Sequence, residues 1–199
     1  DYLATQGDDV TILRQTPCRG PGVAFETGFR HLLTRLADTD VIMTLEADNT
    51  SDPQIAVRMI AELESGADLV LAACNARGGG IEGTSWHRVI LSKSANLLMY
   101  LLFRLPKTTT FSSFYRAYRP SLLRRIAVDG EIRFQTKGFV CMAELLLAAA
   151  VAGATISEVP MVLKGFQRQG VSKMKLVRTT IEYLRFILFC APLWLKRWR

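Results

Sequence analysis

Apolar runs and amphipathic stretches alternate along most of the chain. Runs in which nearly every residue is apolar are typical of strands buried on both faces of a sheet, and apolar residues three and four positions apart are typical of helices. These patterns predict strands at 10–14, 41–45, 68–73 and 154–160, and helices at 22–36, 53–65, 87–106 and 139–152. The alternation predicts an α/β domain whose sheet is covered by helices on both faces, with ligands at the carboxyl ends of the strands.

Two helical segments carry more large apolar residues than one buried face requires. The first is 87–106, and the second lies in the basic C-terminal segment 177–199, where Pro192 interrupts the longest apolar run. Neither reaches the roughly 20 apolar residues that cross a bilayer. Because tryptophans and basic residues flank both segments, we expect amphipathic helices that lie peripherally on the cytoplasmic face of a membrane. Burial of both helices in the core or in a dimer interface is the alternative.

The composition describes one globular domain with a substantial core. The chain has 199 residues, of which 49% are hydrophobic and 22% are charged. Its formal charge of +7 is distributed unevenly, because residues 1–65 carry a net −6 and residues 66–199 a net +13. This asymmetry predicts an acidic face suited to a metal ion and a basic face suited to phosphates or anionic lipid. The sequence has no zinc-finger spacing, RNA-binding signature or aromatic-interleaved basic stripe, so we expect no nucleic-acid partner.

The cysteines and histidines indicate neither a disulfide framework nor a metal centre. The four cysteines stand singly, at positions 18, 74, 141 and 190, which favours reduced thiols in a cytosolic protein. His31 and His87 are not accompanied by acids or cysteines at ligand spacing, so we interpret both as structural.

The strongest candidate for chemistry is an acidic pair after the predicted strand 41–45. In "LEADNTSDP", Glu46 and Asp48 are separated by Ala47, and residues two apart in an extended segment point the same way. Two carboxylates at a sheet edge suit Mg²⁺ or Mn²⁺, which completes its shell with water and substrate phosphate oxygens, so a diphosphate is the implied partner. The alternative is that acids gather at helix N-termini in any case, as Asp52 does.

Five segments, in sequence order, resemble the family 2 glycosyltransferases with a GT-A fold. "LEADNTSDP" is similar to their acid-x-acid motif, and "RGPGVAFETGF" at 19–29 to their RG-x-G-x-A-x-x-x-GF segment. Three further segments resemble the dolichol-phosphate mannosyltransferase branch: "GGGIEG" at 78–83, "SSFYRAYRP" at 112–120 and "SEVPMVLKGFQRQGVSKMKL" at 157–176. The resemblance covers residues 10 to about 185.

The resemblance implies a GT-A (Rossmann-like) fold with a mixed, mainly parallel sheet. It divides the chain into a catalytic domain at 1–176 and a basic amphipathic membrane-interface helix at 177–199. Relatives open with a strand and a proline-tyrosine-asparagine-like loop that grips the nucleotide. No segment of this sequence corresponds to that loop, so we expect the catalytic domain to lack its first βα unit.

The resemblance also implies an activity, namely metal-dependent, inverting transfer of a sugar to a polyprenyl phosphate. The donor is expected to be a nucleotide sugar of the GDP-mannose or UDP-glucose type. Asp48 and Glu46 are expected to hold the metal, and Gly22 and Ala47 to join them in binding the donor. The motifs assign binding of the acceptor phosphate to Ser113, Arg116, Arg168 and Lys173. Asp48 and Arg116 are the expected catalytic residues, since an arginine can hold two phosphate oxygens at once.

Two residues depart from the family pattern. Glu46 stands where this branch usually has aspartate, which makes Asp48 the safer metal ligand, and Cys74 stands where many relatives carry an arginine before the glycine loop. Glu144 lies near the position of a base in relatives that use hydroxyl acceptors, but an anionic lipid phosphate needs no base. A carboxylate that lies on a helix face or orients a loop is the alternative for Glu144. The glycines at 78–80 form either a mobile flap or a plain surface turn.

Two other functions stay open on the sequence. The chain could be a GT-A glycosyltransferase with a saccharide hydroxyl acceptor, or an inactive membrane-associated fragment. Activity on a polyprenyl phosphate but not on free sugars would distinguish the polyprenyl-phosphate enzyme from the saccharide-acceptor enzyme. The residues upstream of Asp1 would decide whether the chain is an inactive fragment.

Overall fold

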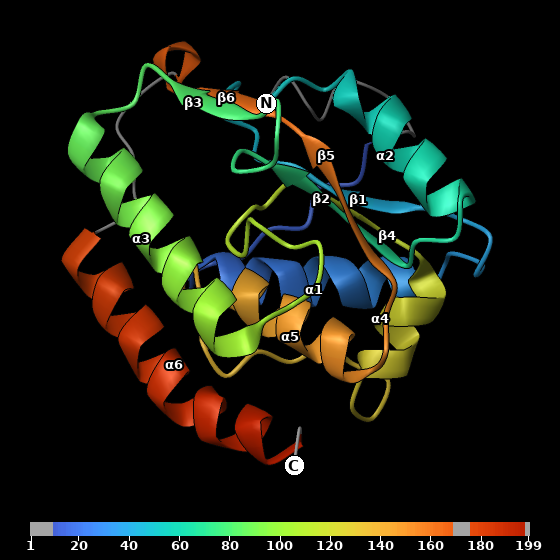
Figure 1. Ribbon diagram of the computed structural model, residues 1–199. Helices are drawn as coiled ribbons and strands as arrows, with labels where there is room; N and C mark the ends of the chain where they lie inside the picture. Colours follow the sequence, from blue (N-terminus) through green and yellow to red (C-terminus); the bar gives the residue numbers. More distant parts are fainter. Residues whose placement is uncertain (1–9, 169–175, 198–199) are drawn as a thin grey trace.

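A four-stranded sheet lies at the centre of the fold (Figure 1). The computed structural model describes residues 10–168 and 176–197, with side chains at 10–168 and 177–188. The strand order is β1 (Ile42–Thr44), β4 (Arg116–Tyr118), β2 (Leu69–Ala73) and β5 (Ile156–Pro160). β4 runs antiparallel to both β1 and β2, whereas β2 and β5 are parallel. Three of these strands therefore point the same way, and the expected mixed, mainly parallel sheet is confirmed.

Helices cover both faces of this sheet. In chain order they are α1 (Pro21–Leu33), α2 (Ile55–Glu64), α3 (Trp86–Phe103), α4 (Pro120–Ile126), α5 (Cys141–Val151) and α6 (Leu176–Arg197). α2 packs on one face, where Met59 joins a cluster with Val70 and Ala72 of β2. The other five helices contribute to a larger cluster that contains Leu69 and Leu71 of the same strand. Successive residues of β2 thus pack on opposite faces of the sheet. Because both faces are buried, the strand is apolar along its whole length.

α1 begins and packs as its sequence predicts. Pro21 occupies the first turn after the N-cap Gly20, a position where the missing N–H of proline is not needed. Phe29 is buried on the inner face of the helix and meets the ring of Tyr118 edge-on, with 5.7 Å between ring centroids. This contact joins α1 to β4.

Gly22 allows α1 to approach another backbone segment closely. Its N–H donates to the carbonyl oxygen of Lys137 over 3.1 Å. A Cβ atom at Gly22 would lie 2.8 Å from the carbonyl oxygen of Thr136 and 3.0 Å from the Cα of Lys137, distances that side-chain carbons do not tolerate. The glycine motif at the start of α1 is therefore a packing feature.

α2 starts two residues later than the sequence pattern predicts. The helix begins at Ile55, and Asp52 lies in the turn just before it, where its Oδ1 accepts the N–H of Gln54 over 2.9 Å. The chain between β1 and this turn contains Glu46 and Asp48.

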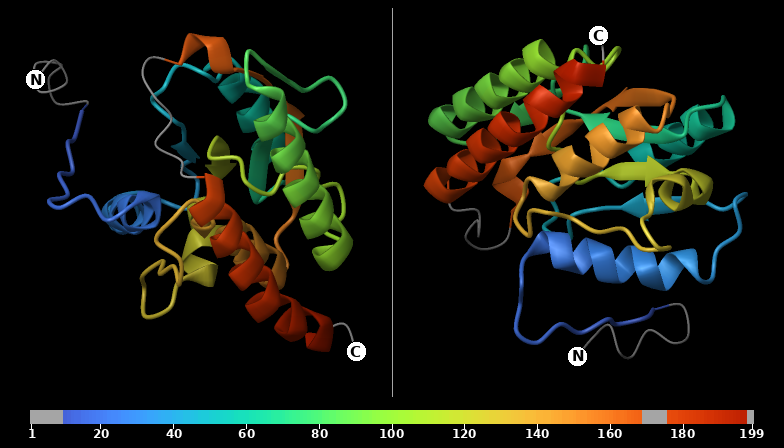
Figure 2. Two further views of the ribbon diagram at one scale, coloured as in Figure 1. Left: turned by 90° about the vertical axis from the view of Figure 1, so that its left-hand side faces the viewer. Right: turned by 90° about the horizontal axis from the view of Figure 1, so that it is seen from below.

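The predicted strand at 10–14 is wrong. Its residues carry no strand assignment, and Val10, Ile12 and Leu13 are exposed. Figure 2 shows this segment running outside α1, away from the sheet. A strand needs a neighbouring strand to pair its backbone groups, and within the described residues none lies beside 10–14.

The sequence patterns do not predict four short elements. They are β3 (Gly80–Glu82), β4, α4 and β6 (Val162–Lys164), and a 3₁₀ turn at Gly165–Gln167 follows β6. β3 and β6 pair in parallel as a separate two-stranded sheet. β4 is only three residues long and includes Arg116, so it shows neither a strand period nor an apolar run.

α3 and α6 lie side by side at one edge of the molecule, and each exposes apolar side chains (Figures 1 and 2). α3 buries Met99 and Phe103, and α6 buries Phe186 and Ile187. Their exposed apolar residues are Trp86, Ile90, Leu91, Leu97, Leu98, Leu101, Val177, Ile181, Leu184 and Leu188. Complete burial of these helices in the core is therefore wrong for the described part of the chain. Over the same residues, no helix has the length and apolar character needed to cross a membrane.

We predict that Gly22→Ala lowers the free energy of unfolding by about 1–3 kcal/mol, because the added methyl group overpacks the contact with the 136–137 backbone. Gly28→Ala is the matched control in the same helix. A Cβ atom there meets no atom within 4 Å, so this variant is expected to be neutral or stabilised by up to about 1 kcal/mol. Urea denaturation of both variants measures the difference, and equal stabilities would contradict the packing role of Gly22.

Candidate functional site

The acidic pair lies in a cavity of about 620 Å³ between the end of β1, α3 and α6. Glu46 and Asp48 line it together with Arg168, which follows the 3₁₀ turn after β6, and with Arg88 in the first turn of α3. The carboxyl end of a strand thus forms one wall of the cavity, as expected for a sheet of this kind.

The remaining walls of the cavity are mostly apolar. α3 contributes Leu91, Ala95, Leu98 and Met99, α6 contributes Tyr183, Leu184 and Ile187, and the loops contribute Phe111, Phe114 and Phe139. The cavity therefore combines two carboxylates and two arginines with a long hydrophobic wall. This combination suits a ligand with an anionic head and an apolar tail.

The carboxylate of Asp48 is held at both oxygens. Oδ1 accepts the N–H of Thr50 over 3.1 Å and its hydroxyl over 2.6 Å. Oδ2 accepts Nε of Arg168 over 2.8 Å and lies 2.7 Å from Nη2 of the same arginine. Burial raises the pKa of Asp48, but the Thr50 hydrogen bonds and Arg168 together outweigh burial and lower the pKa below its ordinary value of 3.8. Asp48 is therefore ionised at neutral pH.

Glu46 has the opposite tendency. Its burial raises its pKa above the ordinary value of 4.5, the negative charge of Asp48 raises it further, and Arg168 offsets only part of this. The charge of Asp48 thus adds to the cost of ionising the buried Glu46, and Arg168 compensates for only part of that cost. An additional positive charge in this cavity would relieve that cost.

The residues present fit a divalent cation. The guanidinium of Arg168 already takes the place of a cation on Asp48, and carboxylate oxygens are the ligands that Mg²⁺ and Mn²⁺ prefer. Over the described residues, no group of three or more His, Cys, Asp or Glu side chains is placed to hold a metal. A cation here would take Glu46 and Asp48 as protein ligands and complete its shell with water and substrate oxygens.

Arg116 does not line the cavity, so its expected contact with the acceptor phosphate is not supported by the structure. The residue is 0% exposed within β4. Its Nε donates to the carbonyl oxygen of Ser113 over 2.7 Å, Nη1 to that of Met142 over 2.7 Å and Nη2 to that of Phe111 over 2.9 Å. Arg116 thus ties β4 to α5 and to the loop before β4, and its guanidinium donates to backbone carbonyls outside the cavity.

The structure places the other predicted site residues as follows. Ala47 is exposed between the two acids. Gly22 packs against the 136–137 backbone and does not line the cavity, so its expected contact with the donor is not supported by the structure. The hydroxyl of Ser113 donates to the carbonyl oxygen of Tyr115, and its neighbour Ser112 lines the cavity instead. Lys173 lies outside the described residues.

Glu144 orients a loop. Its two carboxylate oxygens accept the N–H groups of Gln135 and Thr136, each over 2.8 Å. Glu144 therefore acts as a loop-orienting carboxylate. It does not line the cavity that contains Glu46 and Asp48.

Sequence reasoning did not single out Arg88, which lines the cavity with Arg168. Its signal was its place at the start of the apolar helix 87–106, beside the glycine loop. Cys74, the other departure from the family pattern, is mostly buried, and burial raises its pKa to about 11. A neutral thiol cannot replace an arginine as a phosphate ligand, so Arg88 and Arg168 are the cations of the cavity within the described chain.

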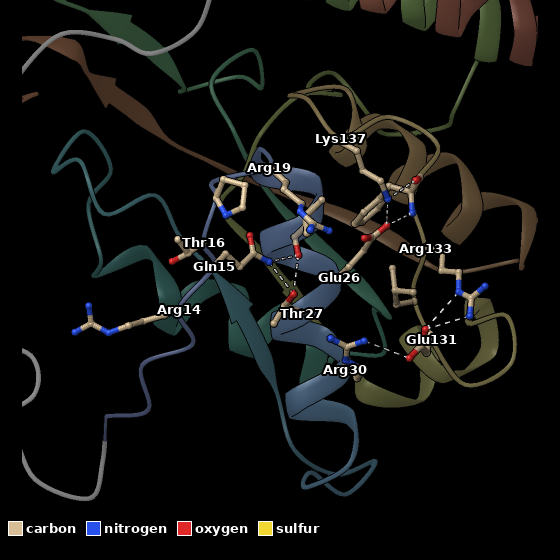
Figure 3. Close-up of a pocket in the computed structure, with 14 residues that line it drawn as sticks. Arg14, Gln15, Thr16, Arg19, Glu26, Thr27, Arg30, Glu131, Arg133 and Lys137 are labelled. Atoms are coloured by element: carbon tan, nitrogen blue, oxygen red, sulfur yellow. Dashed lines mark hydrogen bonds and ion pairs between the residues drawn. The ribbon is translucent and has the colours of Figure 1, made fainter.

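A second hollow, of about 560 Å³, lies between α1, the segment before it and residues 131–137 (Figure 3). The described part of the chain contributes two carboxylates to this hollow, and both are paired within it. Glu26 accepts Nζ of Lys137 over 2.6 Å, and Glu131 pairs with Arg30 and Arg133. These pairs fix the loop against α1, and neither acid that the described residues contribute to the hollow is free to hold a cation.

Comparison with known proteins shows what the chain is similar to. The family model described as "Glycosyl transferase family 2" matches residues 1–127. Three curated relatives are the polyprenol monophosphomannose synthase of Mycolicibacterium smegmatis, the dolichol-phosphate mannosyltransferase of Pyrococcus furiosus and the undecaprenyl-phosphate mannosyltransferase of Micrococcus luteus. They are 30%, 28% and 30% identical over 87%, 89% and 81% of this chain. The chain spans 63%, 47% and 63% of their lengths.

A solved structure supports the same fold. Glucosyl-3-phosphoglycerate synthase from Mycobacterium tuberculosis, in complex with phosphoglyceric acid, superposes on 82% of this chain and 50% of its own with a TM-score of 0.52 and 15% identity. The GT-A fold expected from the sequence is confirmed by this similarity.

We predict that Glu46→Gln raises the melting temperature by about 2 °C at pH 7 in EDTA, because it removes a carboxylate whose ionisation the fold disfavours. The raised pKa means that the folded state binds this proton more tightly than the unfolded state. The benefit of protonation is complete below the ordinary pKa of 4.5 and is lost as pH rises through the raised value, so the two proteins should converge in acid. Calorimetry across this pH range measures the difference in melting temperature, with Glu64→Gln, at an exposed position, as the control. A Glu46→Gln variant less stable than the parent at pH 7 would contradict the claim that the fold disfavours ionisation of Glu46.

Proposed function

The chain belongs to glycosyl transferase family 2, and we propose that it transfers a sugar from a nucleotide-sugar donor to the phosphate of a polyprenyl lipid. The three curated relatives are named for mannose and for a polyprenol, dolichol or undecaprenyl phosphate, which favours a donor of the GDP-mannose type over one of the UDP-glucose type. The observation that carries the proposal is the single cavity that joins Glu46 and Asp48 to Arg168 and Arg88 along an apolar wall.

The chemistry of the cavity matches the two substrates. The acidic pair lies at the end of β1 and lines the cavity, where it would face a divalent cation and the donor diphosphate, and the exposed Ala47 between the acids would lie beside the donor. A bound Mg²⁺ or Mn²⁺ would neutralise the negative charge that develops on the leaving nucleoside diphosphate. Arg168 and Arg88 supply positive charge for the acceptor phosphate, with Lys173 and Ser113 as further candidates from the motifs.

The proposed reaction is a single displacement with inversion at the anomeric carbon. An acceptor phosphate is already anionic near neutral pH, so no side chain has to remove a proton from it. The carboxylate of Glu144 is consistent with this, because it is engaged with two backbone N–H groups and does not line the cavity. A saccharide hydroxyl acceptor would require a base, and the structure offers no observation that favours this alternative.

We also propose that the protein lies on the cytoplasmic face of a membrane. The apolar wall of the cavity is built from α3 and α6, and the same two helices expose apolar side chains, among them Trp86 at 74% and Leu188 at 75%. Helices that bury one apolar stripe and expose another suit a position in the interface of a bilayer. A polyprenyl chain could then pass from the lipid phase to the cavity along α3 and α6.

We predict that Asp48→Asn lowers kcat for mannosyl transfer to a short-chain polyprenyl phosphate by at least about 10³-fold, since it removes the charge that positions the cation. The measurement uses the full natural protein that contains this chain, with Mn²⁺ and GDP-mannose. Asp38→Asn is the control, because Asp38 pairs with Arg124 outside the cavity and its loss should leave kcat unchanged.

The acceptor range is tested in the same assay. Transfer to the polyprenyl phosphate with none to free saccharides is the expected result. Transfer to saccharides alone, or full activity of Asp48→Asn in EDTA, would overturn the proposal.

A further inference from the structure

Arg168 is bound to the carboxylate that the proposed cation needs. Its Nε and Nη2 both contact Oδ2 of Asp48, at 2.8 and 2.7 Å. Oδ1 of Asp48 is already committed to the N–H and hydroxyl of Thr50. Oδ2 is thus the oxygen that a metal ion would have to share with the arginine, and two positive charges on one oxygen repel each other.

The contact with Asp48 also conflicts with the proposed role of Arg168 in binding the acceptor phosphate. Of the two arginines that line the cavity, Arg168 is the one whose Nε and Nη2 are held by Asp48. An arginine binds a phosphate through such a fork of two N–H groups, so a guanidinium occupied by Asp48 cannot offer that edge to an acceptor. Nε and Nη2 of Arg168 cannot donate to Asp48 and to an acceptor phosphate at the same time.

We propose that Arg168 and the divalent cation compete for Asp48, so that binding of the cation frees the Arg168 guanidinium for the acceptor phosphate. Arg168 is then a positioning residue that couples the two substrate sites, and the donor with its cation binds before the acceptor. This inference rests on the proposed function, since it assumes a cation at Asp48 and a phosphate-bearing acceptor in the same cavity.

The charges in the cavity favour this exchange. Glu46 and Asp48 both line the cavity, and the ion pair with Arg168 engages the carboxylate of Asp48. A divalent cation matches the pair in charge. The side chain of Arg168 is 28% exposed, so it can leave Asp48 without dismantling the core, and the anionic phosphate of an acceptor gives it a new partner.

Coupling of this kind is reciprocal. If the cation releases the arginine that binds the acceptor phosphate, the acceptor phosphate must equally strengthen binding of the cation. Without the cation, the carboxylate of Asp48 and the guanidinium of Arg168 occupy each other. This pairing disfavours binding of the acceptor to a protein that has no donor.

The test measures Mn²⁺ binding directly, by the loss of the free-ion EPR signal, in the purified full chain without substrates. Arg168→Gln is expected to bind Mn²⁺ about tenfold more tightly than the parent protein, because the competing charge is gone. Arg168→Lys, which keeps the charge but loses the fork, should fall between them. Arg88→Gln removes the same charge from the same cavity without touching Asp48, and its affinity should change less than about threefold.

A second measurement follows geranyl phosphate binding by calorimetry. Mn²⁺ should tighten binding of geranyl phosphate to the parent protein and to Arg88→Gln, and should have no such effect on Arg168→Gln. Unchanged or weaker Mn²⁺ binding by Arg168→Gln would overturn the competition and leave the proposed function standing. Failure of the parent protein and of every variant to bind Mn²⁺ would instead overturn the metal role in the proposed function, and the competition with it.

Discussion

The carboxylate of Asp48 must be balanced by positive charge, and the functional part of this structure is arranged around that requirement. Asp48 and Glu46 follow one buried strand and line one cavity, so each makes the ionised state of the other more costly. In the structure Arg168 supplies the balancing charge. A protein that only needed stability would gain little from placing two acids here, whereas a protein that binds a divalent cation needs such a pair.

The sheet explains why the acids and the arginine meet. β1 and β2 run in the same direction on either side of β4, and β5 lies parallel to β2, so the chain segments that leave these strands emerge at one edge. The acidic pair follows β1, and Arg168 follows the 3₁₀ turn after β6, 120 residues later. α3 and α6 close the same edge with apolar side chains. The charged end of the cavity is thereby joined to an exposed apolar surface.

The sequence allowed the α/β class, the larger helices and the acidic pair to be predicted, because each has a local signature. The motif position of Arg116 says nothing of burial, and only the fold shows that carbonyl oxygens of α5 and of the loop before β4 satisfy its donors. The apolar run at 10–14 is insufficient for a related reason, since a run of apolar residues does not supply a pairing partner. Arg88 was overlooked because its proximity to Arg168 depends on how α3 packs, which no local pattern encodes.

A crystal structure of the protein with Mn²⁺ and a nucleoside diphosphate tests the central claim most directly, because the anomalous signal of manganese locates the ion. Our account predicts manganese within bonding distance of carboxylate oxygens of Asp48 and Glu46, with the guanidinium of Arg168 withdrawn from Asp48. Manganese bound elsewhere, with the Asp48–Arg168 pair intact beside the diphosphate, would contradict it.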